Sequence, residues 1–164
     1  MNKKASFSTD AIIGMLTLFL LLACCAKCQT IPTEVKQATV AALKASDTDG
    51  MHEEGFIWGK DAVGNVLIVV SAVVPCQAKI CVTTFDAANP EVAARLTSID
   101  GFAHVHPKGD GKHAWVQPPS REDLNFAALS PGTIYIVIGS ASKVVYFYDS
   151  HGVTSTMKLK EFLQ

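Results

Sequence analysis

The chain has little charge and no excess of either sign. Asp, Glu, Lys and Arg make up 18% of its 164 residues, and the formal net charge at pH 7 is −1. Domains that bind nucleic acid carry a basic patch or stripe, and this sequence has none. The composition therefore argues against a nucleic-acid partner, and it gives no reason to expect an acidic surface as the substrate.

The sequence also lacks a clear membrane span. Residues 11–23 are apolar and follow Lys3 and Lys4, but this run is shorter than the roughly 20 residues of a membrane-spanning helix and fits the apolar region of a secretory signal. It ends in Leu21-Leu22-Ala23-Cys24, which resembles the bacterial lipobox. The resemblance implies cleavage before Cys24 and lipidation of Cys24, so that the protein is anchored by lipid to the periplasmic or extracellular side of a bacterial membrane. A plain signal peptide and an uncleaved anchor are the alternatives, and both also place the chain outside the cytoplasm.

Internal repeats and low-complexity segments are absent as well, so we expect a single domain, at residues 34–164. The apolar N-terminal run predicts a signal peptide at residues 1–23, and residues 24–33 are expected to be a tether. A chain of this length can bury a core of its own. Cys76 and Cys81 flank four residues between two strand-like runs, and we expect a disulfide between them because exported proteins keep such bridges. A metal site at these two cysteines is not favoured, because a typical zinc motif has a second cysteine pair and this one has none.

The hydrophobic pattern predicts a mixed α/β fold. Helices are expected at residues 33–45, 90–98 and 120–129 and strands at 56–60, 66–74, 80–85, 99–106, 134–138 and 144–149, with a final strand or helix at 156–163. The nearly continuous β-branched run at 66–74 predicts a strand that is buried on both faces. Asn89 is expected to cap the second helix, with Pro90 at its first position. The order of elements predicts an α-β-α sandwich around one sheet.

Two short motifs carry the chemistry. His104 and His106 end a predicted strand, and alternate residues of a strand point to the same face, so both imidazoles can bind one metal ion. A catalytic zinc has three protein ligands and a position for water, and Asp123 is the natural third ligand. Zinc lowers the pKa of water, which then acts as a nucleophile.

Such a site also needs a general base and a donor for the oxyanion that forms on a carbonyl. Ser120 lies three residues before Asp123 at a predicted helix start, shares a helix face with it and can be that donor. The base should be a carboxylate on a neighbouring element. Glu53 and Glu54, which enter the first strand, are the candidates.

The combined pattern resembles the JAMM (JAB1/MPN-type) metalloprotease domain over about residues 50–150. That family has a glutamate at an early strand, then His-x-His-Pro, then Ser-x-x-Asp. The resemblance implies that His104, His106 and Asp123 bind Zn²⁺, that Glu53 activates water and that Ser120 stabilises the tetrahedral intermediate. It also implies a curved mixed sheet between helices and the hydrolysis of peptide or isopeptide bonds. In the envelope, peptides or peptidoglycan cross-links are the expected substrates.

The sequence departs from the family pattern in two places. The spacer at residues 107–119 is longer than the family's usual one, and this loop could cover the site or shape substrate choice. An alignment on Gly55 and Gly59 places His52 at the glutamate position. A shift of one residue brings in Glu53, which we prefer to Glu54.

Each motif also has an ordinary interpretation. Ser120 and Asp123 are close to a helix capping box, and the two histidines could be an unremarkable strand pair. The chain could also be an inactive JAB/MPN-like binding module anchored to the membrane. A different His-x-His metal fold needs further ligands, and only His113 and His151 remain, both of which we expect in loops or turns.

Overall fold

The computed structural model describes residues 30–48, 50–70, 83, 85, 89–112 and 114–164. Residues from Pro32 to Gln164 form one compact unit. None of the helices in these ranges is long and apolar enough to cross a membrane. The expected features that lie outside the described residues are the signal peptide, the Cys24 lipidation site, most of the tether, the Cys76–Cys81 disulfide, most of the 80–85 strand and His113.

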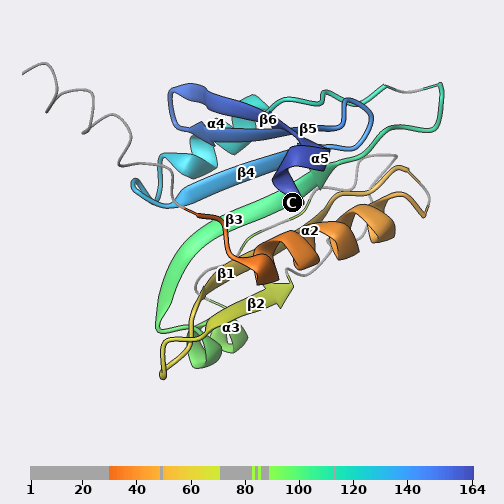
Figure 1. Ribbon diagram of the computed structural model, residues 1–164. Coiled ribbons are helices and arrows are strands. Elements are labelled where there is room, and N and C mark those ends of the chain that lie inside the picture. Colours follow the sequence, from red (N-terminus) through yellow and green to blue (C-terminus); the bar gives the residue numbers. More distant parts are fainter. Residues whose placement is uncertain (1–29, 49, 71–82, 84, 86–88, 113) are drawn as a thin grey trace, which may run out of the picture. The chain divides into compact units, whose positions relative to one another are not determined.

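One mixed sheet forms the centre of this unit (Figure 1). Its strands are β1 (Glu54–Lys60), β2 (Val66–Val70), β3 (Ser98–His106), β4 (Ile134–Gly139), β5 (Val144–Asp149) and β6 (Gly152–Lys158). The order across the six-stranded sheet is β2-β1-β3-β4-β5-β6. The β3–β4 pair is parallel and the other pairs are antiparallel. β3 is therefore an interior strand with neighbours on both sides.

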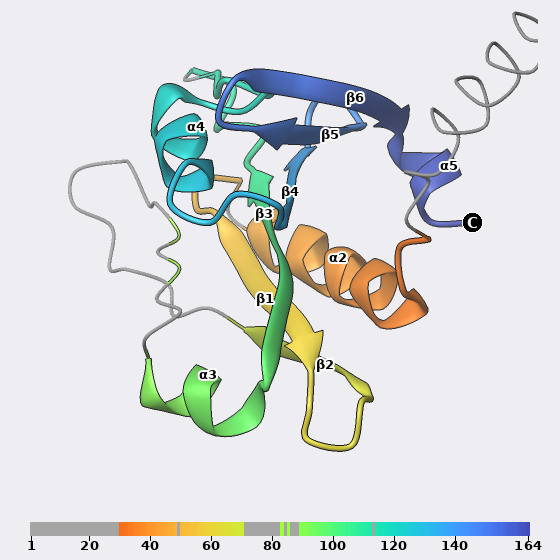
Figure 2. The ribbon, with the colours of Figure 1, turned by 90° about the vertical axis from the view of Figure 1, so that its left-hand side faces the viewer.

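Four helices accompany the sheet: α2 (Thr33–Ser46), α3 (Pro90–Arg95), α4 (Arg121–Ala127) and α5 (Leu159–Phe162). α2 lies on one side of β1 and β3, and α4 lies on the other side (Figure 2). This arrangement confirms the expected mixed α/β class with a single sheet. The expected start of α3 is also confirmed, because Pro90 is its first residue and the Asn89 side chain accepts a hydrogen bond from Glu91 N at 2.9 Å.

The alternation of side chains along the strands gives the sheet two apolar faces. On the α4 face, Phe102 and Tyr135 stack with ring centroids 5.5 Å apart, and Phe126 of α4 contacts both rings. On the opposite face, Phe147 contacts Phe162 of α5, and Trp58 is buried as expected for a core residue. His104 belongs to the α4 face, because it lies two residues after Phe102 on the same strand.

Two strand predictions were wrong in part. Residues 66–74 were expected to be buried on both faces, but among the described strands β2 lies at one end of the sheet and pairs with β1, and Val70 is 71% exposed. A β-branched run promotes an extended backbone and does not by itself decide how central the strand is. At the C-terminus, strand β6 and helix α5 both form. The pattern missed the start of β6 because nearly all its side chains are exposed, so it has no apolar periodicity.

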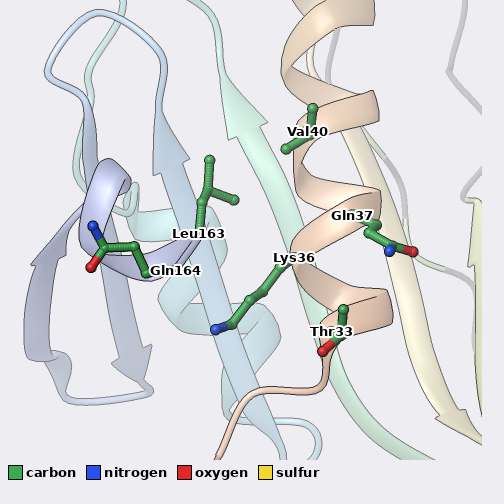
Figure 3. A pocket seen from close by; sticks show the side chains of 6 residues that line it. All are labelled: Thr33, Lys36, Gln37, Val40, Leu163 and Gln164. Carbon is green, nitrogen blue, oxygen red and sulfur yellow. The ribbon is translucent and has the colours of Figure 1, made fainter.

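A hollow of about 280 Å³ lies between α2 and the C-terminus (Figure 3). Its lining residues are Thr33, Lys36, Gln37, Val40, Leu163 and Gln164. None of the histidines and carboxylates of the two sequence motifs lines this hollow, so it is separate from the residues proposed for the chemistry.

Candidate metal centre

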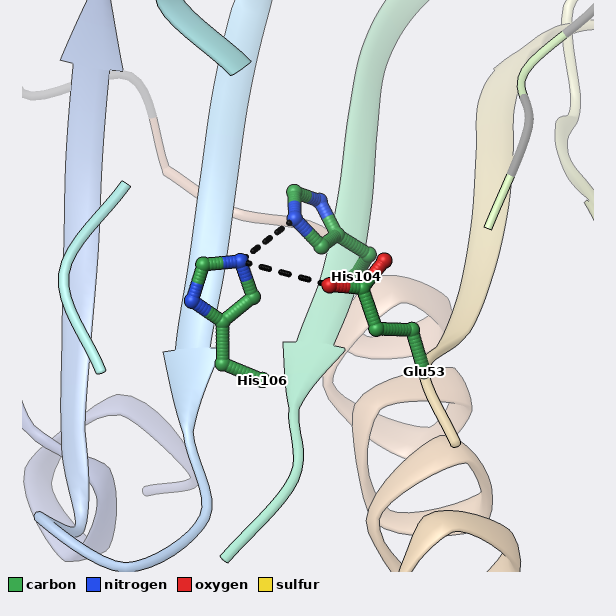
Figure 4. A group of neighbouring side chains, drawn as sticks. All are labelled: Glu53, His104 and His106. Atoms are coloured by element: carbon green, nitrogen blue, oxygen red, sulfur yellow. Dashed lines mark hydrogen bonds and ion pairs between the residues drawn. The ribbon is translucent and has the colours of Figure 1, made fainter. Parts of the chain in front are cut away.

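His104 and His106 lie at the end of β3 on its α4 face, and each is 3% exposed. Their Nε2 atoms are 3.1 Å apart. Figure 4 shows the two rings in front of β3 and β4, with α2 behind the sheet. The interior position of β3 explains this burial, because neighbouring strands and α4 close around the ring pair.

Glu53 is the residue immediately before β1, and its carboxylate reaches the histidines. Its Oε1 is 3.6 Å from His106 Nε2, and its Oε2 accepts a hydrogen bond from Thr83 N at 2.9 Å. The ligand atoms of Glu53, His104 and His106 all lie within 4.8 Å of one another, and all three residues are buried (Figure 4). This buried group could hold a metal ion.

Glu54, the other glutamate considered as a base, is directed elsewhere. In the β1–β3 register, Glu54 pairs with Val105 and Gly55 pairs with His104. Paired residues share a face, so Glu54 belongs to the face opposite the histidines. Its Oε1 instead lies 3.0 Å from His52 Nε2. Of the two glutamates, Glu53 is the one whose carboxylate reaches the imidazoles.

Asp123 reaches the same point from the first turn of α4. Its Oδ1 is 3.1 Å from His104 Nε2, and its Oδ2 is 3.4 Å from His106 Nε2. Ligands bound at about 2 Å around a tetrahedral zinc lie roughly 3–4 Å apart. The separations among the two imidazoles and Asp123 suit that geometry. The side chain of Asp123 is 15% exposed, more than those of Glu53 and the histidines.

The electrostatics of the site favour a positive charge between the carboxylates. Burial opposes the charged form of His104, but the hydrogen bond to Asp123 and the charges of Asp123 and Glu53 outweigh it, so the pKa of His104 is raised. Burial also opposes the charged form of Asp123, but the two imidazoles and Ser120 hold the pKa of this carboxyl well below its usual range. A metal cation would satisfy the same carboxylates.

Ser120 caps α4. Its backbone N–H and its hydroxyl donate to Asp123 Oδ2 at 2.6 and 2.7 Å, and Asp123 N donates back to Ser120 Oγ at 3.2 Å. The capping-box interpretation is therefore confirmed. The cap and the site use the same carboxylate: Oδ2 is held by Ser120 while Oδ1 faces His104. The cap therefore orients Asp123 toward the histidines.

Replacement of Ser120 by alanine is expected to destabilise the fold by about 1 kcal/mol, because an N-cap side chain is lost. Equilibrium urea denaturation of the protein without added metal measures this change. Ser120→Thr is the matched control, because threonine keeps the capping hydroxyl and should remain close to the wild type. Equal stability of the alanine variant and the wild type would contradict a capping role.

No protein-family model, curated protein or solved structure matches this chain. The interpretation of the site therefore depends on its own residues and their geometry.

Several contacts at the site were not foreseen from the sequence. The Val116 carbonyl lies 2.7 Å from His106 Nδ1, the Thr83 amide binds Glu53, and the Phe85 ring lies 5.8 Å from the His104 ring. Two of them are backbone groups, which carry no signature of residue type. His104 Nδ1 is buried and has no hydrogen-bond partner among the residues that the structure describes. His151 lies in the turn between β5 and β6, as expected.

Proposed function

We propose that this chain is a zinc-dependent hydrolase of peptide or isopeptide bonds with an α-β-α sandwich of the JAB/MPN type. The observation that carries the proposal is the buried group of Glu53, His104 and His106, with Asp123 against both imidazoles. The JAMM pattern is spread over more than 70 residues of sequence, from Glu53 to Asp123, and its members meet at one point. That convergence supports the proposal that these residues form a metal site.

The residues fit a zinc ion by their chemistry. Two imidazoles and one carboxylate, from His104, His106 and Asp123, are the donor types of catalytic zinc sites. Zinc held by them would polarise a carbonyl and lower the pKa of water. Glu53 is then left with one carboxylate oxygen facing the site, because Thr83 N holds the other.

In the proposed reaction, Glu53 acts as the general base. Its Oε1 takes a proton from the attacking water and later passes it to the leaving amine. Ser120 Oγ is the proposed donor to the carbonyl oxygen in the transition state. Its hydroxyl must turn away from Asp123 Oδ2 to do so, and the Ser120 backbone N–H can keep that oxygen in place.

We further propose that the protein acts in a bacterial cell envelope, anchored through lipid on Cys24. The proposed location and lipid anchor depend on the N-terminal sequence and not on the geometry of the site. Peptides and peptidoglycan cross-links contain the amide bonds that such an enzyme would meet there. The inactive binding module is the alternative.

The proposal predicts amide hydrolysis that depends on zinc. The purified full chain, incubated with envelope peptides and cross-linked peptidoglycan fragments, should release new amines. A chelator should abolish the activity and added zinc should restore it, because water needs the metal to become nucleophilic at neutral pH. A purified protein that contains no zinc, does not bind added zinc and cleaves none of these substrates would favour the binding module.

A further inference from the structure

We infer that Gln117 is a positioning residue: it holds the 107–119 loop so that the Val116 carbonyl keeps the proton of neutral His106 on Nδ1. The inference rests on the proposed metal site and adds a residue outside its ligand set. Gln117 belongs to the long spacer in which the sequence departs from the JAMM pattern.

His106 contacts the backbone of Val116. The Val116 carbonyl lies 2.7 Å from His106 Nδ1, and a carbonyl oxygen can only accept a hydrogen bond. Nδ1 is therefore the donor. In the neutral imidazole, Nε2 then carries a lone pair, and this is the atom that faces His104, Asp123 and Glu53. A metal ion binds a histidine through such a lone pair, and the bond at the other ring nitrogen selects the tautomer.

Val116 lies near the end of the 107–119 loop. Its side chain is 63% exposed, so packing of that side chain does not anchor the loop. The beginning of the loop is attached elsewhere, where Lys108 pairs with Asp47 and Gly109 N donates to Gly50 O. The part that carries the Val116 carbonyl needs an attachment of its own.

Gln117 supplies this attachment. Its Nε2 donates to the carbonyls of Pro107 and Trp115 at 2.9 and 3.2 Å, and its Oε1 accepts from the amides of Ala141 and Ser142 at 2.7 and 3.2 Å. An amide side chain has two donor hydrogens and two acceptor lone pairs, and Gln117 uses all four. Both ends of the loop are thereby joined to the turn between β4 and β5.

Gly139 makes room for this arrangement. It pairs with His106 across the parallel β3–β4 ladder, so it lies at the same level of the sheet as the ligand. A Cβ atom on Gly139 would overlap Ser142 Oγ and lie 3.1 Å from Gln117 Oε1. The Gln117 side chain thus packs against bare backbone beside His106, which ties the loop to the strand end that carries the site.

The experiment measures the tautomer of His106 and the zinc affinity of the full chain separately. Long-range proton–nitrogen NMR, on metal-free protein at a pH where His106 is neutral, reports which ring nitrogen carries the proton. We expect the proton on Nδ1 in the wild type and a shift toward Nε2 in Gln117→Ala. Loss of a group that hydrogen-bonds to a metal ligand and orients it costs about 10- to 100-fold in metal affinity. Gln117→Ala should therefore raise the zinc Kd by at least about 10-fold.

Val116→Ala is the matched control. It changes the exposed neighbour of Gln117 but keeps the carbonyl, so both the tautomer and the zinc Kd should stay as in the wild type. Gln117→Glu is a second variant of nearly the same shape; it loses the donors and places a carboxylate against two carbonyls, so it should behave like the alanine variant.

A proton on Nε2 in the wild type would overturn the inference, and so would an unchanged tautomer and Kd in both Gln117 variants. Failure of this inference can be told apart from failure of the proposed function. A wild type that binds no zinc would remove the metal site, whereas the NMR comparison would still test the role of Gln117.

Discussion

Replacement of Glu53 by glutamine is expected to leave zinc bound and to lower turnover by about 100- to 10,000-fold, the usual contribution of a general base. Glutamine has nearly the same shape and can still accept the hydrogen bond from Thr83 N, so the local structure should persist. It has no basic oxygen for the proton of water. Metal analysis together with the rate of amide hydrolysis measures both parts of the prediction.

Glu54→Gln is the matched control for this experiment. The two glutamates are adjacent, but Glu54 pairs with His52 on the other face of the sheet, so its variant should keep near-normal turnover. If Glu54→Gln lost turnover and Glu53→Gln kept it, the base would be Glu54. If Glu53→Gln lost zinc, Glu53 would be a ligand, which its place in the buried three-residue group also allows.

Replacement of Asp123 by asparagine is expected to weaken zinc binding by more than about 100-fold, beyond the usual cost of an outer-shell change. The substitution removes the negative charge that lies 3.1 and 3.4 Å from the two imidazoles. Zinc at 100 times the wild-type Kd should stabilise the wild type by about 2.7 kcal/mol, and a variant bound 100-fold more weakly by only about 0.4 kcal/mol. Urea denaturation of each protein with and without zinc measures the difference.

Glu122→Gln provides the control for the charge change. Glu122 lies beside Asp123 on α4 but is exposed, so its variant should gain the full stabilisation from zinc. The comparison of each variant with itself, with and without metal, separates zinc binding from the loss of the His104–Asp123 ion pair in the metal-free protein. An unchanged zinc effect in Asp123→Asn would exclude Asp123 from the ligand set.

The sequence by itself determined the features that depend on neighbouring residues. His104 and His106 share a face because side chains alternate along any strand, wherever it lies in the sheet. Ser120 and Asp123 cap a helix because they are three residues apart at its first turn. Asn89 and Pro90 start α3 for a similar reason. The mixed α/β class followed from the order of such local patterns.

The tertiary structure alone decided which of these parts meet. The β1–β3 register assigns Glu53 to the face of the histidines and Glu54 to the other face, a choice that the sequence left open. The position of β2 at one end of the described strands and the contact of the Val116 carbonyl with His106 are likewise long-range outcomes. A shift of one residue in strand pairing reverses the facing of every side chain, and the packing of the whole domain sets that register. The buried site thus joins ligand pairs that local periodicity predicts with a glutamate, a carbonyl and a loop anchor that only the folded chain brings to them.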